Sequence, residues 1–286
     1  MPYVHFDMET ADPDDVMTLA MLATHPRAEL RGVTITPGGP DQVGLVRHVL
    51  KRLGRADVPV GVGASKPEKR YVSEFHYKWL GRIDDVPGAP SAEEVITSVV
   101  NAWPDVVMLT GAKLTNVANF IRKGGKLARA VLQGGFAGDS LVPVERRLAK
   151  FAGRETCPTF NLNGDIDAAF VVLESGVPCR LVSKNVCHGL AWTPAFHERV
   201  RGAKRTAGLD IIFEGMGVYL RNKSEGKKLH DPFAACCLIE PACAEWAPVE
   251  VYRERGEWGS KLALGSSTQI TIGADEEAFF RTLTAS

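Results

Sequence analysis

Short apolar segments alternate with amphipathic helical patterns along the first half of the chain. The apolar segments predict strands over residues 3–7, 30–36, 58–62, 106–110 and 128–133. The helical patterns predict helices over residues 13–24, 41–53, 92–103 and 115–122. Strands that alternate with helices in this way form a mainly parallel sheet with helices on both faces. We therefore expect an α/β fold built on a mainly parallel, doubly wound sheet.

The second half of the chain continues the alternation with shorter strand patterns. Helices are expected over residues 165–174, 194–201, 209–220 and 276–283, and strands over 179–183, 250–253, 261–264 and 269–272. The chain shows no internal repeat, low-complexity tract or linker. A single domain over residues 1–286 is therefore expected.

The balance of charges excludes several classes of partner. The chain has 34 Lys and Arg residues and 34 Asp and Glu residues, so no net charge draws it to nucleic acid or to an anionic membrane. No apolar run approaches the roughly 18 residues of a spanning helix, and the N-terminus lacks the pattern of a signal peptide. We expect a cytoplasmic protein that has neither a membrane nor a nucleic acid as its partner.

Five carboxylates lie within nine residues between the first predicted strand and the first predicted helix, at Asp7, Glu9, Asp12, Asp14 and Asp15. Crowded carboxylates raise one another's pKa values, so a fold that keeps them ionised usually supplies a cation. The density of acids therefore predicts a site for a hard cation bound by oxygen ligands.

Helix capping offers an alternative explanation for part of this acidic turn. Asp12 can be the N-cap of a helix that begins at Pro13, where the helix dipole favours two further acids in the first turn. This explanation leaves Asp7 and Glu9 unaccounted for, because acids at the end of a buried strand gain nothing from capping. A metal or catalytic role is therefore favoured for these two.

Glycine-rich turns follow three other predicted strands. In sheets of this kind ligands bind at the carboxyl ends of the strands. The chain places polar or glycine-rich turns there at residues 7–9, 36–39, 110–111 and 133–135. One crevice along a single edge of the sheet is therefore predicted.

A late motif, His230-Asp231-Pro232, repeats the arrangement of the acidic turn. Asp231 can cap a helix that begins at Pro232, or it can add an oxygen ligand to the cation. The imidazole of His230 can donate or accept a proton near neutral pH. The other histidines, His188 among them, are interpreted as structural.

Taken in order, these motifs resemble those of the inosine-uridine-type nucleoside hydrolases, which use calcium to split the N-glycosidic bond of ribonucleosides. The resemblance also rests on Leu114-Thr115-Asn116, on Gly134-Gly135, and on Phe160-Asn161 before Asp165. It implies a nucleoside-hydrolase-like fold, a Ca²⁺ cofactor, a small-molecule nucleoside substrate and a homodimer or homotetramer.

The resemblance also implies roles for individual residues. It makes Asp15 and Asp231 calcium ligands together with the backbone carbonyl of Thr110. It implies that Asp14 and Asn161 bind the ribose. His230 is then the acid that protonates the departing base. The aromatic segment 71–81 is expected to be a polar loop that places His76 and Trp79 near the base.

The chain departs from the family pattern in three places. The acidic turn DMETADPDD is one residue longer and has Glu9 in place of an aspartate, so Glu9 or Asp7 is the calcium ligand and general base, with Glu9 favoured. The turn before Leu114 is also longer, so Gly111 can replace Thr110. Thr159 stands where the family has a glutamate that grips the ribose. The substrate can therefore be a nucleoside with a modified 5′ position, an unusual base or a changed sugar.

Two other functions are compatible with these residues. The altered turn and the missing glutamate suit a nucleoside- or sugar-binding protein that keeps the hydrolase fold without turnover. Asp7 at the end of a first strand also resembles the nucleophile of Mg²⁺-dependent haloacid-dehalogenase-like phosphatases. That second alternative gives no role to His230 and Asp231.

Overall fold

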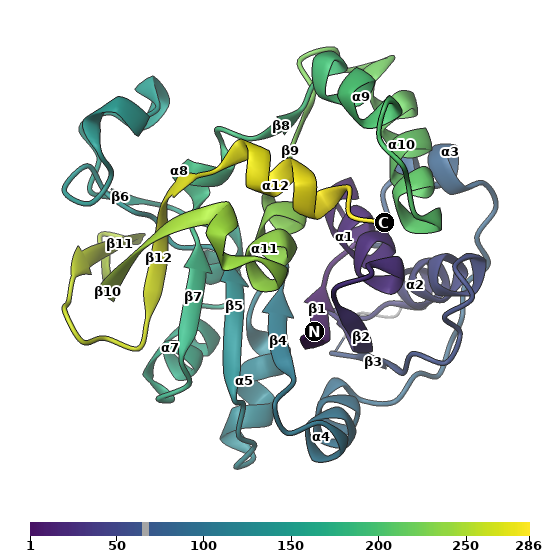
Figure 1. Ribbon diagram of the computed structural model, residues 1–286. Helices are drawn as coiled ribbons and strands as arrows, with labels where there is room; N and C mark the ends of the chain where they lie inside the picture. Colours follow the sequence, from purple (N-terminus) through teal and green to yellow (C-terminus); the bar gives the residue numbers. More distant parts are fainter. Residues whose placement is uncertain (65–68) are drawn as a thin grey trace.

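A ten-stranded sheet forms the centre of the molecule in the computed structural model, which describes residues 1–64 and 69–286 (Figure 1). Its strand order is β3-β2-β1-β4-β5-β7-β12-β10-β11-β6. The strands are β1 Tyr3–Met8, β2 Glu29–Ile35, β3 Val60–Val62, β4 Val107–Thr110, β5 Arg129–Gln133, β6 Thr156–Cys157, β7 Cys179–Val182, β10 Ala244–Glu254, β11 Glu257–Leu262 and β12 Gln269–Ala274. A separate pair is formed by β8 Ala191–Trp192 and β9 Lys227–Lys228.

Helices cover both faces of this sheet. They are α1 Pro13–Thr24, α2 Pro40–Arg52, α3 Glu74–Leu80, α4 Ala92–Ala102, α5 Thr115–Arg122, α6 Phe160–Gly164, α7 Ile166–Glu174, α8 Lys184–Cys187, α9 Pro194–Arg201, α10 Ala207–Leu220, α11 His230–Ile239 and α12 Glu276–Leu283. Three short 3₁₀ helices are η1 Val144–Arg146, η2 Ala149–Phe151 and η3 Pro241–Cys243. None of the helices in the described ranges is long and apolar enough to pass through a membrane.

Side chains of the parallel strands point alternately into two hydrophobic cores, as the period of two of a β-strand requires. In β4, Val107 and Leu109 belong to the core that contains α1 and α11, whereas Met108 belongs to the core that contains α5 and α7. The strands from β3 to β12 in the sheet order are parallel to their neighbours. The predicted α/β class with a mainly parallel, doubly wound sheet is confirmed.

The order of the strands reverses at β1. The connection from β1 leads to β2 on one side, and β4 then pairs with β1 on the other side. Such a reversal leaves a crevice outside the carboxyl ends of the two strands, where ligands bind in open α/β sheets. The acidic turn after β1 and the Gly111 turn after β4 both lie at this crevice, as Asp7 and Thr110 are register partners.

Helices α1 and α11 begin on the same side of the sheet and pack against each other. Deep in their interface the Sγ of Cys236 lies 3.9 Å from the Sδ of Met21, and both residues are almost inaccessible to solvent. The two helices therefore carry their first turns to the same edge of the sheet.

The antiparallel edge of the sheet is longer than the sequence patterns predict. The strand expected over residues 250–253 is part of β10, whereas the one expected over 261–264 overlaps β11 only at its last two residues. The two strands pair through a tight turn at Arg255 and Gly256. Both turn residues have positive φ, 50° and 87°, as a type I′ hairpin requires. An arginine in the first of these positions is an uncommon turn residue, which is why the sequence did not reveal the hairpin.

Candidate active site

A cavity of about 460 Å³ opens beyond the carboxyl ends of β1, β4 and β5. Its lining includes all of the acids that follow β1 and the start of α11, namely Glu9, Asp12, Asp14, Asp15 and Asp231. The segment after β6 adds Thr159, Phe160 and Asn161, and the first residue of α8 and the residue after its end add Lys184 and His188. The predicted crevice at this edge of the sheet is therefore present, but the turn expected there at residues 36–39 does not line it.

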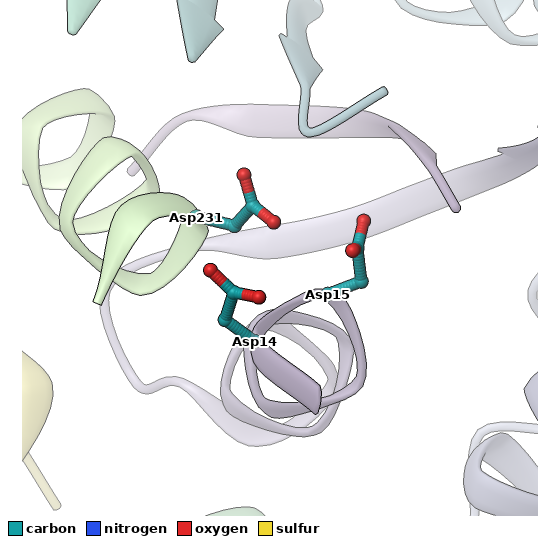
Figure 2. Close-up of side chains that lie close together, drawn as sticks. All are labelled: Asp14, Asp15 and Asp231. Carbon is teal, nitrogen blue, oxygen red and sulfur yellow. The ribbon is translucent and has the colours of Figure 1, made fainter. Parts of the chain in front are cut away.

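Three aspartates at the starts of two helices face one another in this cavity. Figure 2 shows Asp14 and Asp15 on α1 and Asp231 on α11 with their carboxylates directed toward a common point. One oxygen from each lies within 4.8 Å of the others, and all three residues are buried. A Cβ atom on Gly111 would lie 2.9 Å from Oδ1 of Asp231 and 3.0 Å from Oδ1 of Asp15. A side chain at this position would therefore push at least one of the two carboxylates aside.

Among the described residues, no basic side chain forms an ion pair with Asp15 or Asp231. Burial raises the pKa of both carboxyls well above the usual range, and neighbouring acids raise it further. Oδ1 of Asp231 is buried without a hydrogen-bond partner in the part of the chain that the structure describes. A buried acceptor without a donor and two carboxylates in mutual repulsion are the environment that a bound cation stabilises. The cluster fits a metal ion.

Asp14 is neutralised by the protein itself. The Nζ of Lys227 lies 3.2 Å from its Oδ1, and the Nδ1 of His230 lies 3.4 Å from its Oδ2. Burial acts to raise the pKa of Asp14, but Lys227 and His230 outweigh it and hold the net pKa below the usual range. The sequence analysis missed Lys227, although two consecutive lysines precede the His230 motif and gave a signal of positive charge.

The capping prediction is correct for the start of α1 at Pro13, but neither Asp12 nor Asp231 caps a helix with its side chain. Asp12 is the residue before α1, but its side chain makes no capping hydrogen bond and instead accepts one from the Nζ of Lys227 at 3.0 Å. Helix α11 begins at His230, and Asp231 makes no capping bond either. The ammonium group competes for Asp12, and Asp231 is directed into the cavity, so neither carboxylate turns back toward the backbone N–H groups.

Glu9 and Asp7 occupy different layers of the site. Glu9 lines the cavity, and its backbone N–H donates to Oδ1 of Asp15 at 2.9 Å. Burial, followed by the charges of Asp14 and Asp12, raises the pKa of Glu9 to about 7.

Asp7 has no exposed surface and lies behind the cavity wall. Its Oδ1 accepts hydrogen bonds from Thr34 at 2.6 Å and from Asn116 at 2.8 Å. Burial raises the pKa of Asp7 to about 7 despite these two donors. Of the two candidates for the general base, Glu9 is the one that contacts the cavity.

The turn after β4 places Gly111, and not Thr110, on the cavity. Thr110 is fully buried in β4, whereas the carbonyl of Gly111 accepts a hydrogen bond from Nδ2 of Asn161 at 3.1 Å. The same amide nitrogen is 2.9 Å from Oε1 of Gln133. Asn161 is thus held at the cavity by two neighbouring turns, as its predicted position at the sugar requires.

The segment that carries His76 and Trp79 is a helix and not the expected loop. In α3, Trp79 is 8% exposed and its Nε1 donates to the carbonyl of Ile211 on α10 at 2.9 Å. His76 is fully buried, with Nδ1 2.8 Å from Oγ of Ser73. Both side chains pack inward and neither lines the main cavity. The reasoning that these aromatics are too polar for the core was wrong, because α10 supplies a partner for the indole N–H.

His188 was interpreted as structural, yet it lines the cavity. Its ring contacts the ring of His230 edge-on, with centroids 5.5 Å apart. Lys184, at the start of α8, lines the cavity as well and was not singled out. The sequence gave one signal for it, a lysine directly after a buried strand, at the edge where ligands bind.

Comparisons with known proteins agree with this geometry. The family described as inosine-uridine preferring nucleoside hydrolase matches residues 4–281. The pyrimidine-specific ribonucleoside hydrolase RihA of Klebsiella pneumoniae is 28% identical, with 95% of this chain and 94% of that protein covered. The RihA of a Shewanella species is 26% identical over 84% of this chain and 80% of its own length.

Solved structures share the fold. A plant nucleoside hydrolase superposes with a TM-score of 0.74 at 19% identity, and all of both chains is covered. A purine-preferring ribonucleoside hydrolase from Gardnerella vaginalis gives 0.68 at 20% identity, with 98% of each chain covered. An inosine-uridine preferring enzyme from Bacillus anthracis gives 0.73 at 15% identity, with 99% of this chain and 98% of that chain covered. With the family match over nearly its whole length, the chain belongs to the inosine-uridine preferring nucleoside hydrolases, a family of N-glycosyl hydrolases.

Proposed function

We propose that the protein hydrolyses the N-glycosidic bond of a ribonucleoside with the help of Ca²⁺ and releases the free base and ribose. The observation that carries this proposal is the buried pair Asp15 and Asp231, which faces the cavity without a cation of its own. An oxygen-rich cluster of this kind suits a hard cation such as calcium.

The residues placed to hold the ion are Asp15, Asp231, Glu9 and the turn at Thr110 and Gly111. When bound, the ion would orient the two vicinal ribose hydroxyls and favour deprotonation of the attacking water. Asp14 stays anionic next to Lys227 and can accept a hydrogen bond from a ribose hydroxyl through a free lone pair.

Glu9 is the general base in this proposal. It lines the cavity beside Asp15, whereas Asp7 lies behind the wall and positions Asn116. A base must come within hydrogen-bond reach of the proton that it removes, and only Glu9 has that access. The phosphatase alternative is not supported, because it needs Asp7 as an accessible nucleophile and the residue is fully buried.

His230 is the acid. Its ring lines the cavity, its side chain is 25% exposed, and its Nδ1 faces Asp14 at 3.4 Å. This contact fixes the orientation of the ring and leaves Nε2 to carry a proton to the leaving base.

The base that the enzyme prefers is open, since RihA is pyrimidine-specific by name and the Gardnerella enzyme is purine-preferring. A homodimer or homotetramer and a cytoplasmic location stay predictions. Among the described residues, Phe75 and Tyr219 line a neighbouring cavity of about 370 Å³ that shares Ala11 and Asp12 with the main one. These rings, and the ring of Phe160 in the main cavity, offer aromatic surfaces on which a base could stack.

The proposal is tested by measuring the release of free base from a panel of ribonucleosides and 2′-deoxyribonucleosides, with Ca²⁺ and with a chelator. Calcium-dependent release confined to vicinal diols is expected. Asp15→Asn should abolish both turnover and calcium binding, while Asp105→Asn, a change of the same kind at the opposite end of β4, should not. Calcium binding without release of base from any nucleoside would favour the binding-protein alternative.

A further inference from the structure

A lysine without an acidic partner lines the same cavity at a distance from the acids. Lys184 follows β7, which lies three strands from β1 in the sheet, so its backbone is about 14 Å from the acidic turn at the usual strand spacing. Its Nζ donates to the carbonyl of Pro158 at 2.7 Å. No carboxylate lies within ion-pair distance of it in residues 1–64 and 69–286.

Two more lysines reinforce the positive charge at this end. The Nζ of Lys150 is 3.4 Å from Nδ1 of His188, and the Nζ of Lys228 donates to the carbonyl of His188 at 2.7 Å. Neither ammonium group has a carboxylate partner within the described ranges. The pKa of the His188 ring is lowered to about 4, first by burial and then by Lys150, His230, Lys184 and Lys228. The side chains that lower this pKa are therefore all basic.

An unpaired hydroxyl accompanies the lysines. Thr159 lines the cavity at 2% exposure, and its Oγ1 has no hydrogen-bond partner among the described residues. A buried hydroxyl without a partner costs free energy unless a ligand supplies one.

The two lysines at the two ends of the cavity differ in their partners. Lys227, at the acidic end, is paired with both Asp12 and Asp14. Lys184 lies at the other end of the same cavity, and its partners within the described part of the chain are neutral, a carbonyl oxygen and a thiol sulfur. A cation that the protein leaves unneutralised inside a ligand cavity is a binding group for an anion.

We propose that the substrate carries an anionic group, a phosphate or a carboxylate, which Lys184 and Thr159 bind with Lys150, Lys228 and His188 behind them. This inference rests on the proposed function, because the acids bind the ribose diol and thereby direct the rest of the ligand toward β7. The group can be a phosphate on the 5′ carbon or a carboxylate on the base, and the experiment separates the two.

The first test compares kcat/KM for uridine, uridine 5′-monophosphate and orotidine, whose base bears a carboxylate. We expect one of the two anionic substrates to exceed uridine, and the one that does so identifies the source of the charge. Lys184→Gln should lower that preference roughly 10- to 100-fold, the loss of a charge-assisted hydrogen bond. Lys184→Arg should keep it, and Lys126→Gln, an equal change of charge at the opposite edge of the sheet, should not alter it.

A preference for uridine over both anionic substrates would overturn the proposal, as would an unchanged preference in Lys184→Gln. Circular dichroism and thermal melting show that the variants compared are folded.

A second test needs no turnover and measures binding of ribose 5-phosphate and of ribose by calorimetry. Tighter binding of the phosphate that is lost in Lys184→Gln supports an anion site at Lys184, even if no nucleoside is hydrolysed and the proposed function fails. Equal binding of the two sugars, together with preferred hydrolysis of uridine, removes the anion site and leaves the proposed function intact.

Discussion

Substitution of Lys227 by methionine should destabilise the protein strongly, and more at neutral than at acidic pH. Lys227 has a side chain that is 5% exposed, and it pairs with Asp14, whose side chain is 4% exposed. Removal of Lys227 leaves the buried carboxylate of Asp14 with only His230 as a partner, and breaking a buried pair in this way typically costs about 3 to 5 kcal/mol. Its second partner, Asp12, is 53% exposed and contributes little by comparison.

The dependence on pH follows from the direction of the pKa shift. In the native protein the pKa of Asp14 lies below its usual value. The ion pair of Asp14 with Lys227 therefore stabilises the fold fully at pH values above the unfolded pKa of about 4. This stabilisation is lost only as the pH falls through the lower pKa that Asp14 has in the folded protein. Without Lys227, burial, which raises the pKa of Asp14, is opposed only by His230, so we expect the pKa of Asp14 to rise in the variant. The variant therefore regains stability as pH falls and Asp14 is protonated.

The assay is urea unfolding of wild type and Lys227→Met at pH 7.5 and pH 5.5, in chelator so that no metal contributes. The difference in unfolding free energy should be several kcal/mol at pH 7.5 and smaller at pH 5.5. The double variant Lys227→Met with Asp14→Asn should recover part of the loss, because the buried charge is gone. A difference below about 1 kcal/mol, or one that is equal at both pH values, would refute the reasoning.

Three further predictions concern the site. His230→Ala should lower kcat roughly 100-fold with a smaller change in KM, measured on the best nucleoside of the panel; an unchanged kcat would remove this residue from proton transfer. Because the pKa values of Asp15 and Asp231 are raised and a metal ion binds their deprotonated forms, calcium affinity measured by calorimetry should be weaker at pH 5.5 than at pH 7.5, with protons released on binding. Gly111→Ala should weaken calcium binding at least tenfold while the protein stays folded, since the new methyl would lie 2.9 Å and 3.0 Å from oxygens of the two aspartates; equal affinity would show that the turn moves aside.

The parallel half of the fold was predictable because its helices and strands alternate with distinct periods. Helices α1, α5, α9 and α12 begin and end where the sequence predicts. The hairpin of β10 and β11 was only partly found, because antiparallel strands with one solvent-facing side carry a weaker apolar pattern than strands that are buried on both faces. Helix α3 was missed because its aromatic side chains carry polar groups, which suggested an exposed loop. The indole N–H of Trp79 in fact donates to the carbonyl of Ile211, far away in the sequence.

The density of acids in the sequence predicted which acids form the site. It did not predict which of them pair with a basic side chain. Asp14 and Asp15 are neighbours in the sequence, yet one is paired with Lys227 and the other has no cation. That difference depends on a residue more than two hundred positions away, which the β8–β9 pair brings to the start of α1. Likewise, alternation within β1 indicates that Asp7 and Glu9 share a side, but only the packing of Thr34 and Asn116 shows that Asp7 is enclosed.

The two carboxylates without a cation stand on separate helices, so their spacing is set by the contact between α1 and α11. That contact includes Met21 and Cys236, several residues beyond Asp15 and Asp231 along their helices. A change of side-chain volume there alters how closely the helices approach, and with it the gap between the carboxylates. Ca²⁺ requires its oxygens at about 2.3 to 2.6 Å. Substitutions in this core, which no substrate contacts, should therefore change the affinity for the ion.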